Sequence, residues 1–233
     1  MKKSIFLAAL VLIGASCFAQ KSNVSKARNL VDAETPDYAG ARAAIEEALQ
    51  NDETKDQANT WYVAGFIGYK EFENGNFKRQ VGQNVDVNAW GDAVLESLTY
   101  WEKAYDMALV PTIDKKGKEK YDTKTPKSIL PKVVDYFNFQ PLIIAGFEAY
   151  NVGNPSKAYD MFIAHCNIPT MKMMQDNPAD LAKIVCDSNY YIFTYQSGQL
   201  AEAAERYEEA KASYMRMNTE QAKQNALYDD IVN

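Results

Sequence analysis

The chain has a single histidine, His165, among its 233 residues. One imidazole excludes metal sites built from several histidines, and any Ser-His-Asp or Cys-His mechanism would have to use this side chain. No glycine pair brackets a Lys-Ser or Lys-Thr step, so the sequence has no Gly-rich phosphate loop. Acidic pairs such as Glu46-Glu47 and Glu208-Glu209 are adjacent on predicted helices, where their side chains splay apart. We therefore expect a protein that is not an enzyme and that needs no cofactor or metal.

Long apolar runs are also scarce. After the N-terminus no segment approaches the ~20 apolar residues that a transmembrane helix needs. The first residues, MKKSIFLAALVLIGASCFAQ, join two lysines to an apolar run from Ile5 to Ile13 and end in small residues. This layout is typical of a secretory signal peptide over residues 1–19. We expect an exported domain over residues 20–233, periplasmic or secreted.

The alternative is a lipoprotein that carries its lipid anchor on Cys17 at a membrane surface. Lipoprotein signals usually have a large aliphatic residue three places before the cysteine, and Gly14 stands there. The sequence therefore favours cleavage after Ala19 over an anchor.

Basic residues are outnumbered: 25 Lys and Arg stand against 31 Asp and Glu, for a net charge of −6. An acidic chain lacks the electrostatic footprint for phosphate backbones, so we expect no nucleic-acid partner. The local exception is residues 114–127, with six lysines and three acids. Their glycine and proline predict a solvated loop.

Cysteine is rare, and cleavage of the signal peptide would leave only Cys166 and Cys186. Two cysteines do not make a disulfide-rich scaffold. They are either buried thiols or, if the helices that carry them are neighbours, partners in a disulfide.

What the chain does have is a repeated triplet of small, large and small residues, spaced four and then three apart. Such residues share one helix face, where a bulky side chain between two small ones fills the gap to a close neighbouring helix. The four copies are Ala41, Ile45 and Ala48; Ser97, Trp101 and Ala104; Ala158, Phe162 and His165; and Ala203, Tyr207 and Ala210. This recurrence predicts an array of similar helices.

Two glycines mark a second kind of helix before the triplets. Gly65 and Gly146 are each followed by a phenylalanine and, four residues on, by a tyrosine. A glycine inside a helix costs ~1 kcal/mol relative to alanine, so its use at equivalent places indicates close helix packing. Pro141 suits the first turn of the second such helix, which we expect to begin near Gln140.

Together these features resemble the tetratricopeptide repeats, helix–turn–helix units with a W-x2-L-G-x2-Y…A-x3-F…P signature. Trp61 and Gly65 match its first half, and Gly146, Ala158 and Phe162 match it most closely. The resemblance implies an all-α solenoid of antiparallel helix pairs, with about four repeats and loop insertions.

We expect the repeats over residues 24–53, 58–109, 139–170 and 184–218. About twenty extra residues separate the Gly65 and Trp101 helices, and we expect them to form a loop insertion. A last helix over residues 219–232 either closes the array or begins a fifth pair.

One segment within that insertion has a pattern close to a calcium loop. Asn84, Asp86 and Asn88 alternate as early calcium ligands do, but no glycine follows Asn88 and Glu96 comes one residue late. We expect Asp86 or Asn88 to cap the following helix instead.

In the tetratricopeptide family the first helix of each pair lines a concave groove. Aligning the helices on Gly65, Gly146 and Tyr191 identifies the residues expected to line it here: Tyr62, Phe66, Tyr69, Phe147, Tyr150, Ile192 and Tyr195. The resemblance implies a protein–protein interaction scaffold that binds a peptide segment or partner subunit. One alternative is a glycan or small-ligand binding protein, whose aromatics stack on sugar rings. Another is that these aromatics pack the core of the repeats.

Overall fold

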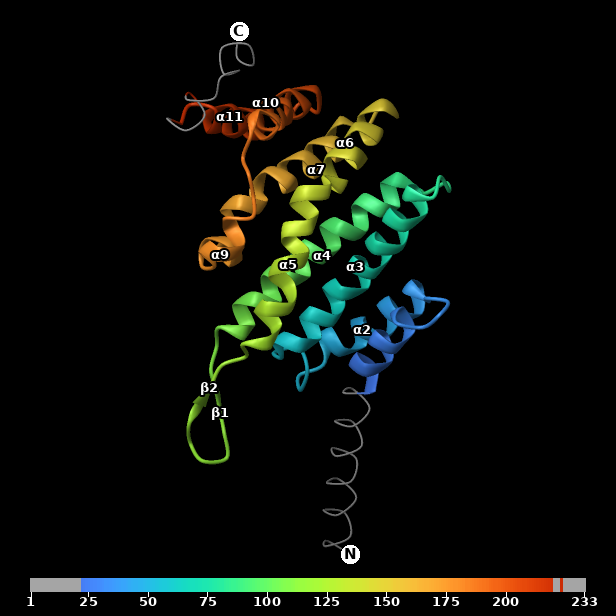
Figure 1. The fold of residues 1–233 in the computed structure, drawn as a ribbon, viewed down its shortest axis with the longest axis vertical. Helices are drawn as coiled ribbons and strands as arrows, with labels where there is room; N and C mark the ends of the chain where they lie inside the picture. Colours follow the sequence, from blue (N-terminus) through green and yellow to red (C-terminus); the bar gives the residue numbers. More distant parts are fainter. Residues whose placement is uncertain (1–21, 220–222, 224–233) are drawn as a thin grey trace, which may run out of the picture. The chain divides into compact units, whose positions relative to one another are not determined.

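The computed structural model describes residues 22–219 and residue 223. These residues form helices and one short hairpin, in the all-α helical repeat fold that the sequence predicts (Figure 1). No described helix is long and apolar enough to span a bilayer. The predicted signal peptide, residues 1–19, and most of the predicted last helix, residues 219–232, lie outside the described residues.

The chain divides into two compact units. Of the described residues, the first unit contains 22–74 and 96–129, and the second contains 75–95 and those from 130 onward.

The first unit begins with a helix over residues 22–31. Its other elements are α2 (Tyr38–Gln50), the first part of α3 (Ala58–Gln80), the second part of α4 (Val87–Ala108), the strands β1 (Thr112–Ile113) and β2 (Glu119–Lys120), and the start of α5 (Lys124–Phe139).

Gly65 brings α3 and α4 into close contact in this unit. A Cβ atom at Gly65 would collide with the indole of Trp101 and would lie 3.0 Å from the Ser97 carbonyl oxygen. The Ser97 hydroxyl donates to the Gly65 carbonyl at 2.9 Å, and the Trp101 indole N–H donates to the Tyr62 carbonyl at 3.2 Å. Glycine is therefore required here by the approach of the second helix.

An ion-pair cluster holds α2 against both of these helices. Arg42 on α2 donates to Glu71 on α3 at 2.6 Å and to both carboxylate oxygens of Glu96 on α4. All three side chains are partly buried, so the cluster is less screened by solvent than a surface pair.

The predicted loop insertion between the Gly65 and Trp101 helices is instead mostly helical. α3 is 23 residues long and α4 is 22, so the extra residues lengthen both helices. The predicted cap is confirmed, because the Asp86 carboxylate accepts a hydrogen bond from the Ala89 N–H at 3.0 Å.

The second unit contains the end of α3, the start of α4 and most of α5. Its remaining elements are α6 (Pro141–Asn151), α7 (Pro155–Asn167), the 3-10 helix η1 (Ile168–Thr170), α8 (Lys172–Gln175), α9 (Pro178–Leu181), α10 (Ser188–Ala203) and α11 (Tyr207–Arg216). The helix α6 begins directly after Gln140, with Pro141 in its first turn, as predicted.

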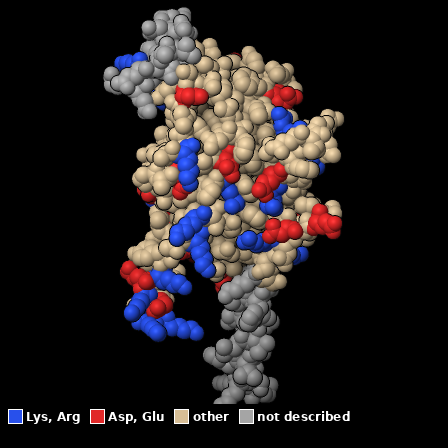
Figure 2. Space-filling view, in the orientation of Figure 1, with Lys and Arg blue, Asp and Glu red and all other residues tan. Residues whose placement is uncertain are grey.

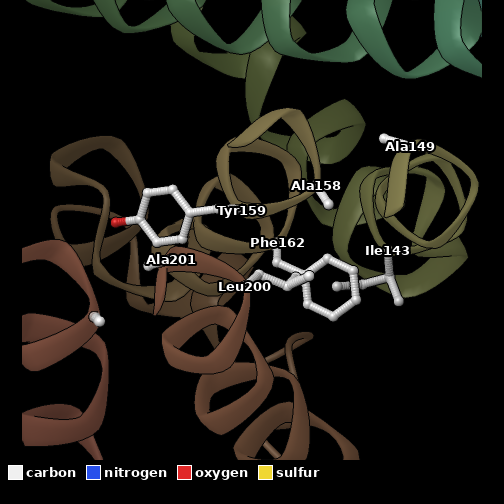
Figure 3. Packing of buried hydrophobic residues seen from close by; sticks show 8 residues of the cluster. Ile143, Ala149, Ala158, Tyr159, Phe162, Leu200 and Ala201 are labelled. Carbon is white, nitrogen blue, oxygen red and sulfur yellow. The ribbon is translucent and has the colours of Figure 1, made fainter. Parts of the chain in front are cut away.

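Neighbour contacts in this unit follow the chain: α6 packs on α7, α7 on α10, and α10 on α11. One apolar cluster joins these helices, with Phe162 of α7 between Ile143 of α6 and Leu200 of α10 (Figure 3). Small residues such as Ala158 and Ala201 lie in the same cluster and let the helices approach.

The fourth predicted triplet is wrong because it spans two helices. α10 ends at Ala203 and α11 begins at Tyr207, so these residues do not share one helix with Ala210. The Tyr207 side chain is exposed rather than packed between two small residues.

The correct register is given by Gly198, which lies inside α10. A Cβ atom there would collide with the ring of Tyr214 on α11, as a Cβ atom at Gly146 of α6 would collide with Phe162 of α7. In each pair, α6 with α7 and α10 with α11, a glycine of the first helix thus contacts an aromatic ring of the second. The glycine and the aromatic residue are equally far apart in the sequence in both pairs.

Gly198→Ala should therefore lower the free energy of unfolding, by about 1–3 kcal/mol for an overpacked core. Helix propensity alone would raise it by about 1 kcal/mol. In a Tyr214→Ala background, where the ring is gone, Gly198→Ala should no longer destabilise. Urea denaturation of the wild type, the two single variants and the double variant, followed by circular dichroism, measures both effects. Stabilisation by Gly198→Ala in the wild-type background would contradict the contact.

Candidate functional site

A hollow of about 190 Å³ lies between α6 and α10, the first helices of successive pairs. Its lining comes from α6, α7 and α10 and consists of Gly146, Phe147, Tyr150, Phe162, Gln196, Gln199, Leu200 and Ala203. This is where the resemblance to tetratricopeptide repeats leads us to expect a binding groove.

The α6 side of the hollow is aromatic and open to solvent. Phe147 and Tyr150 lie three residues apart on one helix face and are 45% and 52% exposed. The Phe147 ring meets the buried Phe162 edge-on, with ring centroids 5.1 Å apart. Apolar area left exposed over an apolar floor is a frequent mark of a contact surface.

The α10 side contributes amides. Gln196 and Gln199 are three residues apart on α10, and Ala203 follows one turn later with a small side chain that leaves the hollow open. The Gln196 Oε1 atom is buried and accepts no hydrogen bond from any described residue. A buried acceptor without a partner is costly, and this oxygen is closed to solvent, so only the exposed amide of Gln199 is open to a ligand as the side chains stand.

The predicted groove residues on α3 lie in a different environment. Tyr62, Phe66 and Tyr69 are each less than one tenth exposed. Tyr62 stacks on Phe66 with centroids 5.8 Å apart, and the Tyr69 ring lies 5.7 Å from that of Trp101. These three aromatics pack the core of the first unit, which is one of the alternatives that the sequence left open.

Ile192 and Tyr195 on α10 are partly buried and do not line the hollow. The predicted alignment used Tyr191 as the equivalent of Gly146, but the Tyr214 contact makes Gly198 the equivalent. In this corrected alignment, Gln199 of α10 is the equivalent of Phe147 of α6. Gln196 and Gln199 were missed, although Gly198 inside a helical pattern was the signal that could have found them.

Both predicted disulfide partners are free thiols, so the structure does not contain that bond. Cys166 is fully buried, and the Thr194 hydroxyl lies 3.6 Å from its Sγ atom. Burial raises the pKa of the Cys166 thiol to about 11, which keeps it protonated and unreactive.

A second, larger hollow of about 510 Å³ lies beside Cys186. Its lining includes polar side chains from three segments, among them Gln175, Tyr190 and Arg216. Arg216 is held in place, because its Nη2 atom donates to the Asn167 side chain at 2.6 Å.

His165 is a buried residue of α7 and is not part of either hollow. Its ring stacks on Phe137 with centroids 4.7 Å apart and meets Phe193 edge-on. Burial lowers the pKa of His165 to about 4, so the side chain is neutral at physiological pH. Among the described residues, no group of three or more His, Cys, Asp and Glu is placed to hold a metal ion.

Comparison with protein-family models, curated proteins and solved structures finds no match to this chain. The described residues define its class: an all-α helical repeat protein.

The buried His165 should make stability depend on pH. Because its folded-state pKa lies below the value of 6.5 expected for the unfolded chain, the unfolded state takes up the proton first as the pH falls. The free energy of unfolding should therefore be at its full value above pH 6.5. It should fall by up to about 3 kcal/mol as the pH drops from 6.5 to 4. His165→Leu should flatten the pH profile of urea denaturation over that window. An unchanged profile would contradict the buried, neutral state.

Proposed function

We propose that this chain is a non-enzymatic protein–protein interaction scaffold, similar to tetratricopeptide repeats and exported to the cell envelope. The hollow between α6 and α10 binds a peptide segment of its partner. The observation that carries this proposal is the exposed pair Phe147 and Tyr150 beside a hollow with an apolar floor.

The size of the hollow favours a peptide over a whole small molecule. Pockets for drug-sized ligands occupy ~300–1,000 Å³. The hollow has about 190 Å³, which suits a single side chain. Its floor of Phe162 and Leu200 makes that side chain apolar, and the rest of the peptide would run along the open helix faces.

The polar groups suit a peptide backbone. A glutamine side chain offers one acceptor oxygen and two N–H donors, which match the N–H and C=O groups of an extended chain. The exposed amide of Gln199 would pair with the peptide backbone, while Tyr150 adds a rigid ring with a hydroxyl. Aromatic residues of this kind commonly dominate the binding energy of interfaces.

The double variant Phe147→Ala, Tyr150→Ala should lose partner binding by more than about tenfold, since aromatic anchors typically contribute 2 kcal/mol or more. The matched control is Phe139→Ala, Tyr207→Ala, which removes two exposed aromatics of the same unit outside the hollow. The measurement is affinity capture from the source cell envelope, followed by titration of the captured protein.

Capture that survives the first double variant, or that fails equally in the control, would contradict the proposed site. Circular dichroism of each variant separates loss of binding from loss of fold. Gln196→Leu, which keeps the shape of the wall but removes the amide, should weaken binding less than the aromatic pair does.

A glycan or small-ligand binding protein is the second candidate. It is favoured by the 510 Å³ hollow, whose volume falls within the range of small-molecule pockets and whose walls carry Gln175, Tyr190 and Arg216. Binding on a glycan array that persists in the Phe147→Ala, Tyr150→Ala variant would support this candidate over the peptide scaffold.

A further inference from the structure

The hollow of about 510 Å³ beside Cys186 belongs wholly to the second unit. Its walls come from η1, α8 and α9, from the segment that follows α9, and from α10, α11 and the residues beside them. Most of the side chains that line it are buried or partly buried, so a molecule inside would lose much of its contact with water. Its volume lies within the ~300–1,000 Å³ of small-molecule pockets.

Arg216 gives this hollow a positive charge. Among the described residues that line it, Arg216 is the only one with a formal charge at pH 7. Its guanidinium donates one hydrogen bond, from Nη2 to the Asn167 Oδ1 atom at 2.6 Å, and forms no ion pair with any described acid. A partly buried cation without a counter-charge favours an anion beside it.

This state of Arg216 differs from that of the other arginines. Figure 2 shows basic and acidic side chains next to one another at several places on the visible face. Three of the other arginines form ion pairs with acids: Arg28, Arg42 and Arg206. Arg79 forms none, but it is exposed and its guanidinium lies 5.0 Å from the ring centre of Trp90. Among the described arginines, only Arg216 is both partly buried and without an acid.

The acids of the neighbouring segments leave the charge of Arg216 uncompensated. Asp176 and Asp180 are each paired with a lysine, at 2.8 Å and 2.6 Å. Asp187 caps α10 and keeps its charge, but it is exposed and does not line the hollow.

The rest of the lining is largely apolar or aromatic. Leu181 and Ile184 supply aliphatic area, and Tyr190 and Tyr191 supply rings. The Tyr190 hydroxyl donates to a backbone carbonyl at 3.1 Å, which fixes the position of its ring. Gln175 adds an amide, whose Nε2 atom donates to another backbone carbonyl at 2.6 Å. These walls suit a ring or a short carbon chain attached to an anionic group.

We propose that this hollow binds a small organic acid, whose carboxylate pairs with Arg216 and whose carbon body lies against the tyrosines and the aliphatic side chains. A guanidinium matches a carboxylate with two parallel N–H···O bonds. A phosphate ester suits the hollow less well, because it carries ~2 negative charges near pH 7 and the lining has one cation. This inference rests on the second candidate function, a glycan or small-ligand binding protein, and is independent of the peptide site.

Cys186 provides a reporter inside the hollow. It is a free thiol in the lining and is partly buried, whereas Cys166 is fully buried. In the chain of residues 20–233, the neutral reagent iodoacetamide should therefore alkylate Cys186 first. An occupant of the hollow should slow this reaction. The alkylation rate of Cys186, followed by mass spectrometry against probe concentration, gives the affinity of each probe.

Two pairs of probes test the carboxylate and separate a sugar acid from an aromatic acid: glucuronate with glucose, and phenylacetate with phenylacetamide. We expect at least one acid to protect Cys186 at a concentration about tenfold or more below that of its neutral partner, as for a hydrogen-bonded charge. Arg216→Gln should abolish this preference, and Arg216→Lys should restore part of it. The matched control Arg79→Gln, outside the hollow, should leave it unchanged.

Equal protection by an acid and its neutral partner in both pairs, or a preference that survives Arg216→Gln, would overturn the proposal while leaving a small-ligand hollow. Failure of all four probes to protect Cys186 would contradict the second candidate function as well. The comparison of acids with neutral partners in the wild type depends on no substitution, and circular dichroism checks the fold of each variant. The Phe147→Ala, Tyr150→Ala variant should behave as the wild type does, which separates this result from the peptide site.

Discussion

The helix pairs depend on one contact, in which a glycine of the first helix receives an aromatic ring of the second. Gly146 with Phe162 and Gly198 with Tyr214 form this contact in the second unit, and Gly65 with Trp101 forms it in the first. Any side chain larger than a hydrogen atom would hold the helices apart. The ring fills the space that the missing Cβ leaves, at the density of a protein interior.

The same contact leaves particular side chains at the surface beside it. On α6 the residues that follow the glycine, Phe147 and Tyr150, are left at the surface beside α10. The amides of Gln196 and Gln199 complete the hollow from the facing helix. An apolar floor with polar groups at its edge is common in ligand-binding sites, which is consistent with the proposed peptide site.

Much of the fold could be predicted because it follows local rules. Pro141 in a first helical turn and the Asp86 cap depend on a few neighbouring residues. The site was harder to predict, because burial depends on neighbours distant in sequence. Phe66 and Phe147 follow equivalent glycines, yet Phe66 is buried under Arg28, whose guanidinium lies 5.0 Å from the ring centre, whereas Phe147 is exposed. The last pair was misaligned because the triplet pattern alone does not reveal where one helix ends and the next begins.

The central claim is that the face of α6 carrying Phe147 contacts a partner protein. The most direct test replaces Phe147 with a photo-crosslinking phenylalanine analogue in the living source cell, with Phe139 as the comparison site, and identifies the adducts by mass spectrometry. The account predicts a discrete protein adduct from position 147 and none from position 139, with the crosslinked peptide carrying an apolar side chain at the point of attachment. No protein adduct from position 147, or the same adducts from both positions, would contradict it.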